Sequence, residues 1–244
     1  MKKIIKKLIK NLLKKLNYKI IKLDYPRPRQ HPFPFPSDKE IELIKKCKGV
    51  LHLGAHRGTE AGVYDWFNKK VLWIEADPNL HEELLVNIRK HYNQSSICAL
   101  IGNKNKKNIP FYISNNDGAC SSIFSFSEDV KKGKLWKERK FFTKDTIYLN
   151  MCRLDDILEL KKIDIKEYDH WIFDIQGAEL IALKGAEKSL QNCKSIQLEI
   201  SKKNYYENGA KWNEIKEFME KKNFDLYNKP ELDHAEVLFI KNEN

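Results

Sequence analysis

The sequence predicts an α/β fold of the Rossmann-like type, in which a mostly parallel sheet ends in an antiparallel hairpin. Short apolar runs at 50–53, 71–74, 171–175 and 194–201 have the length and continuity of strands that are buried on both faces. Segments with helical periodicity separate these runs, and this alternation is typical of βαβ units. The chain of 244 residues is long enough to bury one core of this kind.

The first 23 residues, MKKIIKKLIKNLLKKLNYKIIKL, differ in composition from the rest of the chain. They carry nine lysines and no acid, so the net charge of +11 falls to +2 (11 − 9) without them. Their apolar residues recur every third or fourth position, which predicts a basic amphipathic helix. Such a helix is suited to an anionic membrane surface. Docking on the chain's own domain or on a partner subunit remains the alternative, and nucleic acid is disfavoured.

Two further segments follow this helix. Five of the eight prolines lie in YPRPRQHPFPFP and predict an extended linker over residues 24–36. Residues 37–244 are the predicted folded domain, which opens with a capped helix at SDKEIELIKKC. No run of about 18 apolar residues occurs, so no membrane-spanning helix is expected. The five cysteines lack metal-ligand spacing and are interpreted as reduced thiols of a cytoplasmic protein, with peripheral attachment at the inner face of the membrane as a further expectation.

The segment VLHLGAHRGTEAGVYDWFNKKVLWIEADPNL, residues 50–80, predicts a strand, a glycine turn, a helix and a second strand. Glu75 ends the second strand, 21 residues after Gly54. Both residues therefore fall at the carboxyl edge of the sheet, where open α/β sheets bind ligands. The helix is expected over residues 59–67, with its apolar side formed by Val63, Trp66 and Phe67.

The glycine turn restricts the class of ligand. GAHRG lacks the middle glycine of G-x-G-x-x-G, which lets the backbone approach a pyrophosphate, so a dinucleotide is disfavoured. The chain also lacks the G-x-x-x-x-G-K-[ST] loop of phosphate-binding nucleotidases. An adenosine ligand without phosphates fits better, and S-adenosylmethionine is one. Its carboxylate suits a helix N-terminus, and Glu75 suits its ribose hydroxyls.

A second strand–turn–helix unit lies in YDHWIFDIQGAELIALKGAEKSL, residues 168–190. Its strand brings Asp174 to the ligand edge, while His170 lies at the opposite edge and is interpreted as structural. The next strand, KSIQLEIS, presents Glu199. A helix and the pair FDLYN and AEVLFIKN then predict a hairpin at the edge of a seven-stranded sheet.

Over roughly residues 48–241, the chain resembles the FkbM-type family of S-adenosylmethionine-dependent methyltransferases. The resemblance rests on HLGAHRGTEAGVY, WIEADP, NNDGACSSIF, CRLDDI, FDIQGAELIALKGAEKSL, QLEIS, YYENGA and AEVLFIKN. It implies a methyltransferase sheet and methyl transfer to a hydroxyl, commonly on a sugar or on a secreted glycan or lipid. S-adenosylhomocysteine would be the product.

The residues expected to bind the donor follow the glycine turn, the second strand, the NNDGACSSIF loop and the DIQG turn. His52 departs from the superfamily pattern, because an acid usually stands at the start of this motif, and the contact to the donor's amino group is therefore left to another residue. The predicted donor-binding residues are His52, Gly54, Ala55, His56, Gly58, Glu75, Ala76, Asp77, Ser121, Ser122, Asp174 and Gln176.

Methyl transfer to a hydroxyl needs a base to accept the proton, or a metal that lowers the hydroxyl pKa. Asp174 and Glu199, at neighbouring strand ends, are the first candidates for the base, or for oxygen ligands of Mg²⁺. His234 borders the same edge if the last strand is antiparallel, and its imidazole suits general base catalysis. Tyr206 is a candidate for the acceptor wall, and Asp155 is interpreted as a helix N-cap.

Three other classes of protein remain to be weighed. Methyltransferases that modify amines of nucleic acids commonly carry an [Asp/Asn]-Pro-Pro-aromatic turn, and DIQG has no proline. A nicotinamide dehydrogenase is disfavoured by the turn and by the paired acids. A membrane-attached adenosine-binding or scaffold module without catalysis stays open as the non-enzymatic alternative. The acceptor, the need for metal and assembly into a homo-oligomer are also left open.

Overall fold

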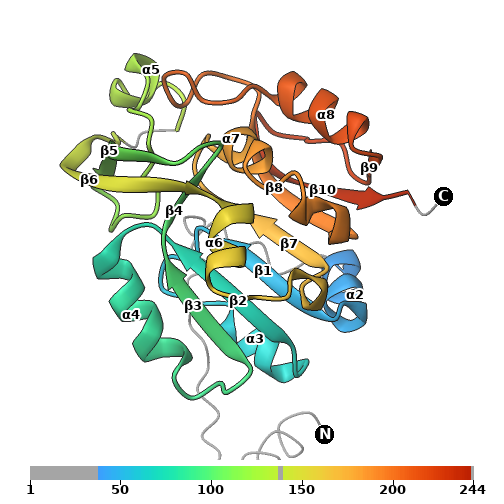
Figure 1. Cartoon of the computed structure of the whole chain (residues 1–244). Helices are drawn as coiled ribbons and strands as arrows, with labels where there is room; N and C mark the ends of the chain where they lie inside the picture. The colour runs from blue at the N-terminus through green and yellow to red at the C-terminus, as the bar shows by residue number, and fades with distance from the viewer. Residues whose placement is uncertain (1–37, 137–139, 243–244) are drawn as a thin grey trace, which may run out of the picture. The chain divides into compact units, whose positions relative to one another are not determined.

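A seven-stranded sheet forms the centre of the structure, a computed structural model that describes residues 38–136 and 140–242. The strands β3, β2, β1, β7 and β8 lie side by side and run parallel, while β10 runs antiparallel to both of its neighbours. This arrangement confirms the predicted α/β fold with its C-terminal hairpin (Figure 1). In sheet order the strands are β3 (Gln94–Cys98), β2 (Lys70–Glu75), β1 (Gly49–Leu53), β7 (His170–Phe173), β8 (Ser195–Ser201), β10 (His234–Lys241) and β9 (Phe224–Leu226).

The N-terminal helix predicted over residues 1–23 and the linker predicted over 24–36 lie outside the described residues. The first described element is α2 (Asp38–Lys46), within the segment predicted as a capped helix. The chain divides into the units Met1–Asp38 and Lys39–Asn244, and the sheet belongs to the second. Among residues 38–136 and 140–242, no helix is long and apolar enough to cross a membrane.

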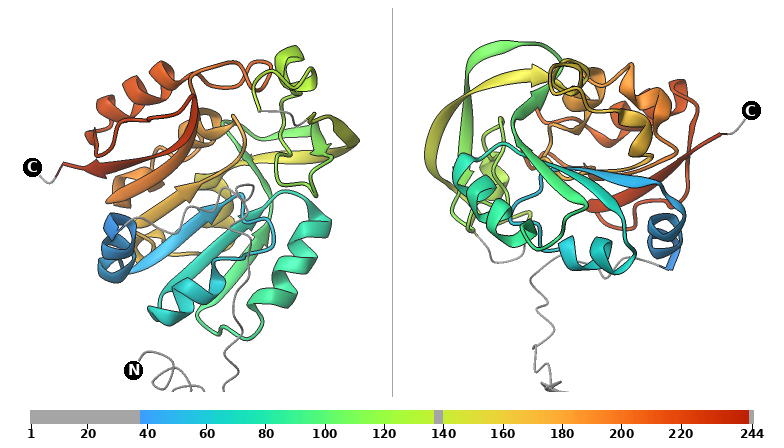
Figure 2. Two further views of the ribbon diagram at one scale, coloured as in Figure 1. Left: turned by 180° about the vertical axis from the view of Figure 1, so that it is seen from behind. Right: turned by 60° about the horizontal axis from the view of Figure 1, so that its bottom comes forward.

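The central strands are apolar because helices cover both faces of the sheet (Figures 1 and 2). In β1, Leu51 and Leu53 face a core that includes Phe173, whereas Val50 packs in a second core with Trp73. Neither set of side chains meets water, which is why these runs do not alternate between apolar and polar residues.

The helices form two layers. The first core is closed by α6 (Leu154–Leu160), α7 (Glu179–Lys184) and α8 (Trp212–Lys221). On the opposite face, α2, α3 (Ala61–Trp66) and α4 (Pro78–Ile88) close the second core. Two 3-10 turns, η1 (Ile165–Glu167) and η2 (Ser189–Asn192), precede β7 and β8, respectively.

The structure corrects the expected apolar side of α3. Ala61 and Tyr64 are its buried residues, whereas Trp66 is 84% exposed. Residues three apart share a helix face, but Trp66 follows Tyr64 by two positions and so points away from the sheet. Asp155 is also not the N-cap of α6, which is Arg153; its carboxylate instead accepts hydrogen bonds from the backbone N and Oγ of Ser189, at 2.9 and 2.6 Å.

A second, three-stranded sheet was not predicted from the sequence. In it, β6 pairs in parallel with β4 and antiparallel with β5. Its inner residues include Leu100, Phe111 and Met151, which form a separate apolar cluster. The short helix α5 lies between β5 and β6 in the chain. The bounds are β4 (Leu100–Gly102), β5 (Lys106–Ser114), α5 (Glu128–Lys131) and β6 (Thr143–Arg153).

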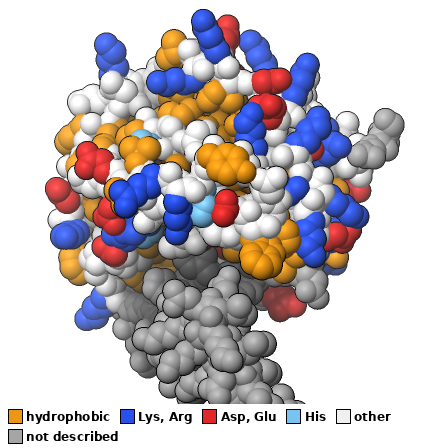
Figure 3. Space-filling model, turned by 90° about the horizontal axis from the view of Figure 1, so that it is seen from below, with side chains coloured by type: hydrophobic (Ala, Val, Ile, Leu, Met, Phe, Trp, Pro, Cys, Tyr) orange, Lys and Arg blue, Asp and Glu red, His pale blue; other side chains and the backbone are white. Residues whose placement is uncertain are grey.

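Charges of both signs are mixed on one face of the folded domain. Figure 3 shows one face of it, where lysine and arginine side chains are intermingled with acidic ones. This mixture agrees with the nearly balanced charge of the chain beyond residue 23. Nucleic-acid binding depends on grouped cations that neutralise phosphates, and the described side chains on this face are not grouped in that way.

Candidate active site

A cleft of about 590 Å³, its open mouth included, lies at the carboxyl ends of β1, β2 and β7. The small sheet and the segment 115–123 form its other wall. Seven of the predicted site residues line the cleft: Gly54, His56, Glu75, Ala76, Ser121, Asp174 and Gln176.

The glycine turn after β1 allows two chain segments to approach closely. Gly54 has a φ of +80°, and a Cβ atom there would lie 1.8 Å from the carbonyl oxygen of Asp174. A side chain at this position would therefore force the end of β7 away from β1. Gly58 also has a positive φ of +65°, and a Cβ atom there would lie 2.5 Å from Leu84 of α4. The two glycines thus permit the turn to pack between β7 and α4.

Glu75 fixes the shape of this turn and also faces the cleft. One carboxylate oxygen accepts the backbone N–H of His56 at 2.7 Å, and the other accepts that of Asp77 at 2.9 Å. Burial raises the pKa of Glu75 to about 7, although these backbone hydrogen bonds oppose the rise. Each carboxylate oxygen can accept more than one hydrogen bond, so Glu75 retains capacity for a ligand hydroxyl.

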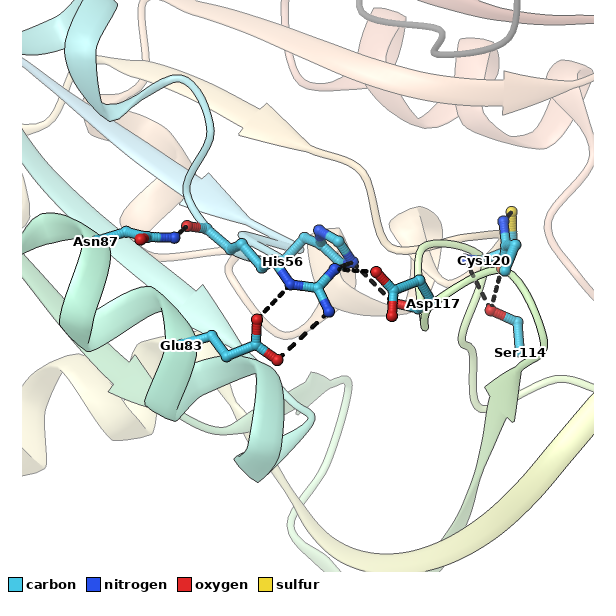
Figure 4. Close-up of polar contacts among 8 residues, drawn as sticks. His56, Glu83, Asn87, Ser114, Asp117 and Cys120 are labelled. Atoms are coloured by element: carbon cyan, nitrogen blue, oxygen red, sulfur yellow. Dashed lines mark hydrogen bonds and ion pairs between the residues drawn. The ribbon is translucent and has the colours of Figure 1, made fainter.

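Arg57 joins the glycine turn to two other walls of the cleft, through Glu83 and Asp117, which Figure 4 labels. Its guanidinium contacts Glu83 of α4 through Nε at 2.5 Å and Asp117 through Nη1 at 2.7 Å. His56 reinforces the second contact, because its Nε2 lies 3.0 Å from the carbonyl oxygen of Asp117. Asn87 donates to the carbonyl oxygen of Arg57 at 2.8 Å. We call these five residues the Arg57 clamp; sequence reasoning had assigned Arg57, Glu83 and Asp117 no role.

The two serines of the loop after β5 have different surroundings. Ser121 lines the cleft, and its Oγ accepts the backbone N–H of Ser114 at 3.1 Å. Ser114 also accepts the backbone N–H of Cys120, which tightens the loop (Figure 4). Ser122 is buried outside the cleft and donates its hydroxyl to the carbonyl oxygen of Gln176 at 2.8 Å. Ser122 therefore ties the loop to the DIQG turn.

The three residues predicted for catalysis lie together. Asp174 follows β7, Glu199 lies in β8, and His234 begins β10. Nε2 of His234 is 2.9 Å from Oε1 of Glu199, while its Nδ1 is 2.9 Å from the hydroxyl of Ser201. Asp174 lines the cleft, whereas Glu199 and His234 stand behind it. We call Asp174, Glu199 and His234 the proton array.

The two carboxyls of the proton array have pKa values that are shifted in opposite directions. Burial raises the pKa of Asp174 well above its usual range, and the nearby Glu199 raises it further. Burial opposes ionisation of Glu199 as well, but the charge and hydrogen bond of His234, with hydrogen bonds from Gln176 and Asp174, lower its pKa. Burial lowers the pKa of His234, and Glu199 more than reverses this, so the net shift is upward. Asp174 is thus the protonated carboxyl and Glu199 the ionised one.

Glu179 is a buried residue that the sequence interpretation missed. Its Oε1 accepts the backbone N–H groups of Ile175 and Gly177, at 3.0 and 3.3 Å, and so holds the DIQG turn. Burial, with a contribution from Glu199, raises its pKa to about 8. The sequence signal that could have indicated Glu179 is an acid two residues after Gly177, in the turn that follows the buried strand β7.

His52 does not line the cleft. Its ring stacks on Trp73 with the centroids 4.8 Å apart, and Nδ1 lies 3.2 Å from the hydroxyl of Tyr64. Side chains alternate along a strand, and in β1 this position points under α3. Burial lowers the pKa of His52 to about 3, so it is neutral. The geometry therefore gives His52 a packing role and leaves the donor's amino group to residues at the cleft.

Three further predicted donor-binding residues shape the cleft without lining it. Ala55 is buried in the core beneath α3, and Gly58 packs on α4. Asp77 is the N-cap of α4 and accepts the backbone N–H of Asn79 at 2.9 Å. His170, interpreted as structural, is fully buried with its Nδ1 2.8 Å from the hydroxyl of Ser195.

The geometry of the acids does not fit the proposed Mg²⁺ site. Within the described part of the chain, no group of three or more His, Cys, Asp or Glu side chains is arranged to hold a metal ion. Oδ1 of Asp174 is engaged by the Gln176 amide at 2.5 Å, and Glu199 is paired with His234. Mg²⁺ prefers octahedral oxygen ligands, and these two carboxyls are committed to hydrogen bonds instead.

Comparison with known proteins places the chain in a family. The model of the methyltransferase FkbM domain matches residues 52–226. No curated protein gave a significant match. Similar solved structures include fibrillarin of Aeropyrum pernix with bound S-adenosyl-L-methionine (14% identity, 81% of this chain and 68% of that chain, TM-score 0.44) and magnesium protoporphyrin IX methyltransferase of Synechocystis PCC 6803 (8%, 84% and 77%, 0.40). A TehB-like methyltransferase of Corynebacterium glutamicum has 12% identity over 95% of this chain and 94% of that chain, with a TM-score of 0.40. Because the family model covers most of the chain, the protein belongs to the FkbM family of S-adenosylmethionine-dependent methyltransferases.

Proposed function

We propose that this protein transfers the methyl group of S-adenosylmethionine to a hydroxyl of a sugar, or of a glycan- or lipid-linked acceptor. The observation that carries the proposal is the proton array beside the cleft. A hydroxyl must lose its proton as its oxygen attacks, and an array of two carboxyls and an imidazole can receive it. The sugar or lipid context comes from the family resemblance.

The residues of the cleft fit an adenosine-containing donor. Glu75, at the end of β2, has free acceptor capacity for ribose hydroxyls. Beside it, Ala76, Leu80, Leu100 and Phe111 form an apolar wall suited to the adenine ring. Asp174 and Gln176 line the cleft on the side of β7, where a carboxyl and an amide suit the amino-acid portion. The bound donor would supply an activated methyl group on sulfur.

The proton of the acceptor hydroxyl enters the array at Asp174, because this is its member at the cleft. Asp174 is protonated at rest and hydrogen-bonded to Glu199, so it passes its own proton on as it accepts another. Glu199 is paired with His234, which takes up the positive charge. The array therefore gains one proton in each methyl transfer. The imidazole must be neutral beforehand, with its proton on Nδ1 beside the hydroxyl of Ser201, so that Nε2 is free to accept the proton from Glu199. Methyl transfer should accelerate as the pH rises through the pKa of the array.

The first experiment is a calorimetric titration of the purified protein with S-adenosylhomocysteine. We expect one-site binding that Glu75→Ala weakens by about tenfold or more, because a hydrogen bond to a charged acceptor contributes about 1.5–3 kcal/mol. Glu82→Ala, which removes an exposed acid of α4, is the matched control and should bind like wild type. Absence of binding up to about millimolar ligand would reject the donor assignment and favour a structural role for the turn.

Catalysis is tested separately from binding. With donor labelled in the methyl group and a panel of glycan and lipid-linked acceptors, Glu199→Gln and His234→Asn should abolish transfer while S-adenosylhomocysteine still binds. These two residues stand behind the cleft, so their replacement leaves its lining intact. Unchanged transfer in both variants would exclude the proton array as the base.

A further inference from the structure

Gln176 stands at the centre of the hydrogen bonds beside the cleft. Its Nε2 donates to Oδ1 of Asp174 at 2.5 Å, and its Oε1 accepts the hydroxyl of Tyr206 at 2.5 Å. Its main-chain carbonyl accepts the hydroxyl of Ser122. The residue is buried and has a φ of +58°, a conformation that costs free energy for a residue other than glycine. Gln176 is thus held by its side-chain amide, which contacts Asp174 and Tyr206, and by its main-chain carbonyl, which contacts Ser122.

Tyr206 determines which way this amide faces. A glutamine side chain can exchange its oxygen and nitrogen by rotating half a turn, and only its hydrogen-bond partners distinguish the two orientations. A tyrosine hydroxyl has one proton to donate, and Oε1 of Gln176 is the nearer acceptor, because the carbonyl oxygen of Cys120 lies at 3.3 Å. With Oε1 held by Tyr206, the NH₂ group must point toward the carboxyls of Asp174 and Glu199.

We propose that Tyr206 and Gln176 are positioning residues of the proton array. Tyr206 holds the amide of Gln176 in one orientation, and the amide keeps the carboxyl of Asp174 turned toward Glu199, along the path to His234. The inference rests on the proposed function, because it assigns these two residues a part in receiving the acceptor's proton. Neither residue takes up the proton itself.

The reversed amide would break this path. If Oε1 faced Asp174, the proton of that carboxyl would be donated to the amide oxygen instead of to Glu199. Glu199 would then lose hydrogen bonds from both Gln176 and Asp174. A carboxylate with fewer donors attracts an adjacent imidazolium more strongly, so His234 would hold its proton to higher pH.

The titration of His234 therefore reports on the amide. Charged groups face this imidazole from three elements: Glu199 of β8, Glu179 of α7 and Glu236 of β10. The rings of Trp136 and Tyr205 pack against it at centroid distances of 5.3 and 4.8 Å. Of these neighbours, only Glu199 receives hydrogen bonds from the amide and from Asp174, so a change of amide orientation should reach His234 through it.

The experiment is an NMR titration of the histidine ring protons in the full chain, with the His234 resonance identified from its loss in His234→Asn. We expect Tyr206→Phe to raise the titration midpoint of His234 by about half a pH unit or more. Gln176→Met, which keeps the length of the side chain without its hydrogen bonds, should raise it in the same direction. The hydroxyl of Tyr206 then retains the carbonyl oxygen of Cys120 as an acceptor.

Tyr205→Phe is the matched control. Tyr205 is adjacent in sequence, is buried in the same aromatic cluster, and contacts the imidazole directly. Its hydroxyl does not contact Gln176. If buried tyrosine hydroxyls act only through packing or stability, both substitutions should move the His234 titration alike, and that result would overturn the proposal.

The double variant Tyr206→Phe/Gln176→Met separates positioning from a direct effect of the tyrosine. Because Tyr206 acts through the amide, its substitution should add nothing once the amide is absent. A full additional shift in the double variant, or an unmoved midpoint in Tyr206→Phe alone, would also overturn the inference. Titration of the wild-type protein with S-adenosylhomocysteine tests the donor assignment independently, so failure of one conclusion is distinguishable from failure of the other.

Discussion

Glu75 illustrates how one buried residue serves both the fold and the ligand. Its two oxygens hold the backbone of the glycine turn and of the N-terminus of α4, through His56 and Asp77. The same carboxyl faces the cleft, and burial raises its pKa to about 7. Its ionisation state therefore changes within the physiological range of pH.

This position of the pKa predicts a pH-dependent donor affinity. Ribose hydroxyls donate to the ionised carboxylate, so binding should tighten as the pH rises through about 7. For a free-state pKa of about 7, the dissociation constant of S-adenosylhomocysteine should fall by about tenfold between pH 6 and pH 8. Calorimetry at several pH values measures this change, and Glu75→Gln should remove it. A slope that persists in Glu75→Gln would assign the titration to another group.

Glu179 should make stability depend on pH in the opposite sense to most acids. Its folded-state pKa of about 8 lies above the ordinary value of 4.5 for a glutamate, so the folded protein keeps a proton that the unfolded chain loses. Its contribution is complete below about pH 4.5, decreases as the pH rises, and is lost once the pH passes about 8. Glu179→Gln cannot ionise, so between pH 5 and pH 9 wild type should lose on the order of a few kcal/mol more than the variant. Urea unfolding measures the difference, and parallel curves would contradict it.

At the scale of elements, the Arg57 clamp connects the glycine turn, α4 and the loop after β5. This loop contributes Gly118, Ala119 and Ser121 to the cleft wall, so the clamp holds part of the wall in place. The side chain of Asp117 is 77% exposed. Exposed ion pairs contribute little, about 0–1 kcal/mol, and salt weakens them. The contact between Arg57 and Asp117 is therefore expected to contribute little free energy.

We predict that Asp117→Asn speeds the dissociation of S-adenosylhomocysteine by about twofold to fivefold. Asparagine tolerates the positive φ of +64° at this position, so the loop should keep its shape. Stopped-flow measurements should also show that added salt speeds dissociation from wild type more than from the variant. The control is Asp129→Asn, which replaces an exposed acid of α5 that pairs with Lys134. Equal rates in Asp117→Asn and wild type at low salt would exclude the clamp from ligand exit.

At the scale of the whole molecule, charge is divided unevenly along the chain. Residues 1–23 account for nine of the eleven net positive charges, and the rest of the chain is nearly balanced. We propose that this segment attaches the protein to anionic membranes, which would bring the cleft near a lipid-linked acceptor. Lysines near such a surface contribute about 1 kcal/mol each.

Deletion of residues 1–23 should therefore abolish sedimentation with anionic vesicles and leave the affinity for S-adenosylhomocysteine unchanged. Neutral vesicles and about 0.5 M salt are the controls, because both remove the electrostatic attraction. A wild-type protein that ignores anionic vesicles at low salt would exclude membrane attachment and favour docking of the helix on protein.

The sequence by itself determined the elements whose signals are local. Strands covered on both faces read as continuous apolar runs, and Gly54 marked a turn because only glycine permits the approach of Asp174. The positions of Glu75, Asp174 and Glu199 at one edge followed from strand direction, since carboxyl ends of parallel strands meet there, and His234 joins them because the antiparallel β10 begins at that edge. The α/β fold and the family could therefore be predicted before any contact was known.

Only the tertiary structure decided which side chains meet. In the small sheet β5 pairs with β6, and no local sequence pattern indicates this pairing because the two strands are far apart in the chain. His52 turns under α3 to stack on Trp73, because the pleat of β1 directs it there. Arg57 contacts Asp117, which lies some sixty residues later in the chain, and Tyr206 contacts Gln176, which lies thirty residues earlier. These contacts depend on how distant elements pack, so their physical cause is a property of the folded core and not of any short stretch of sequence.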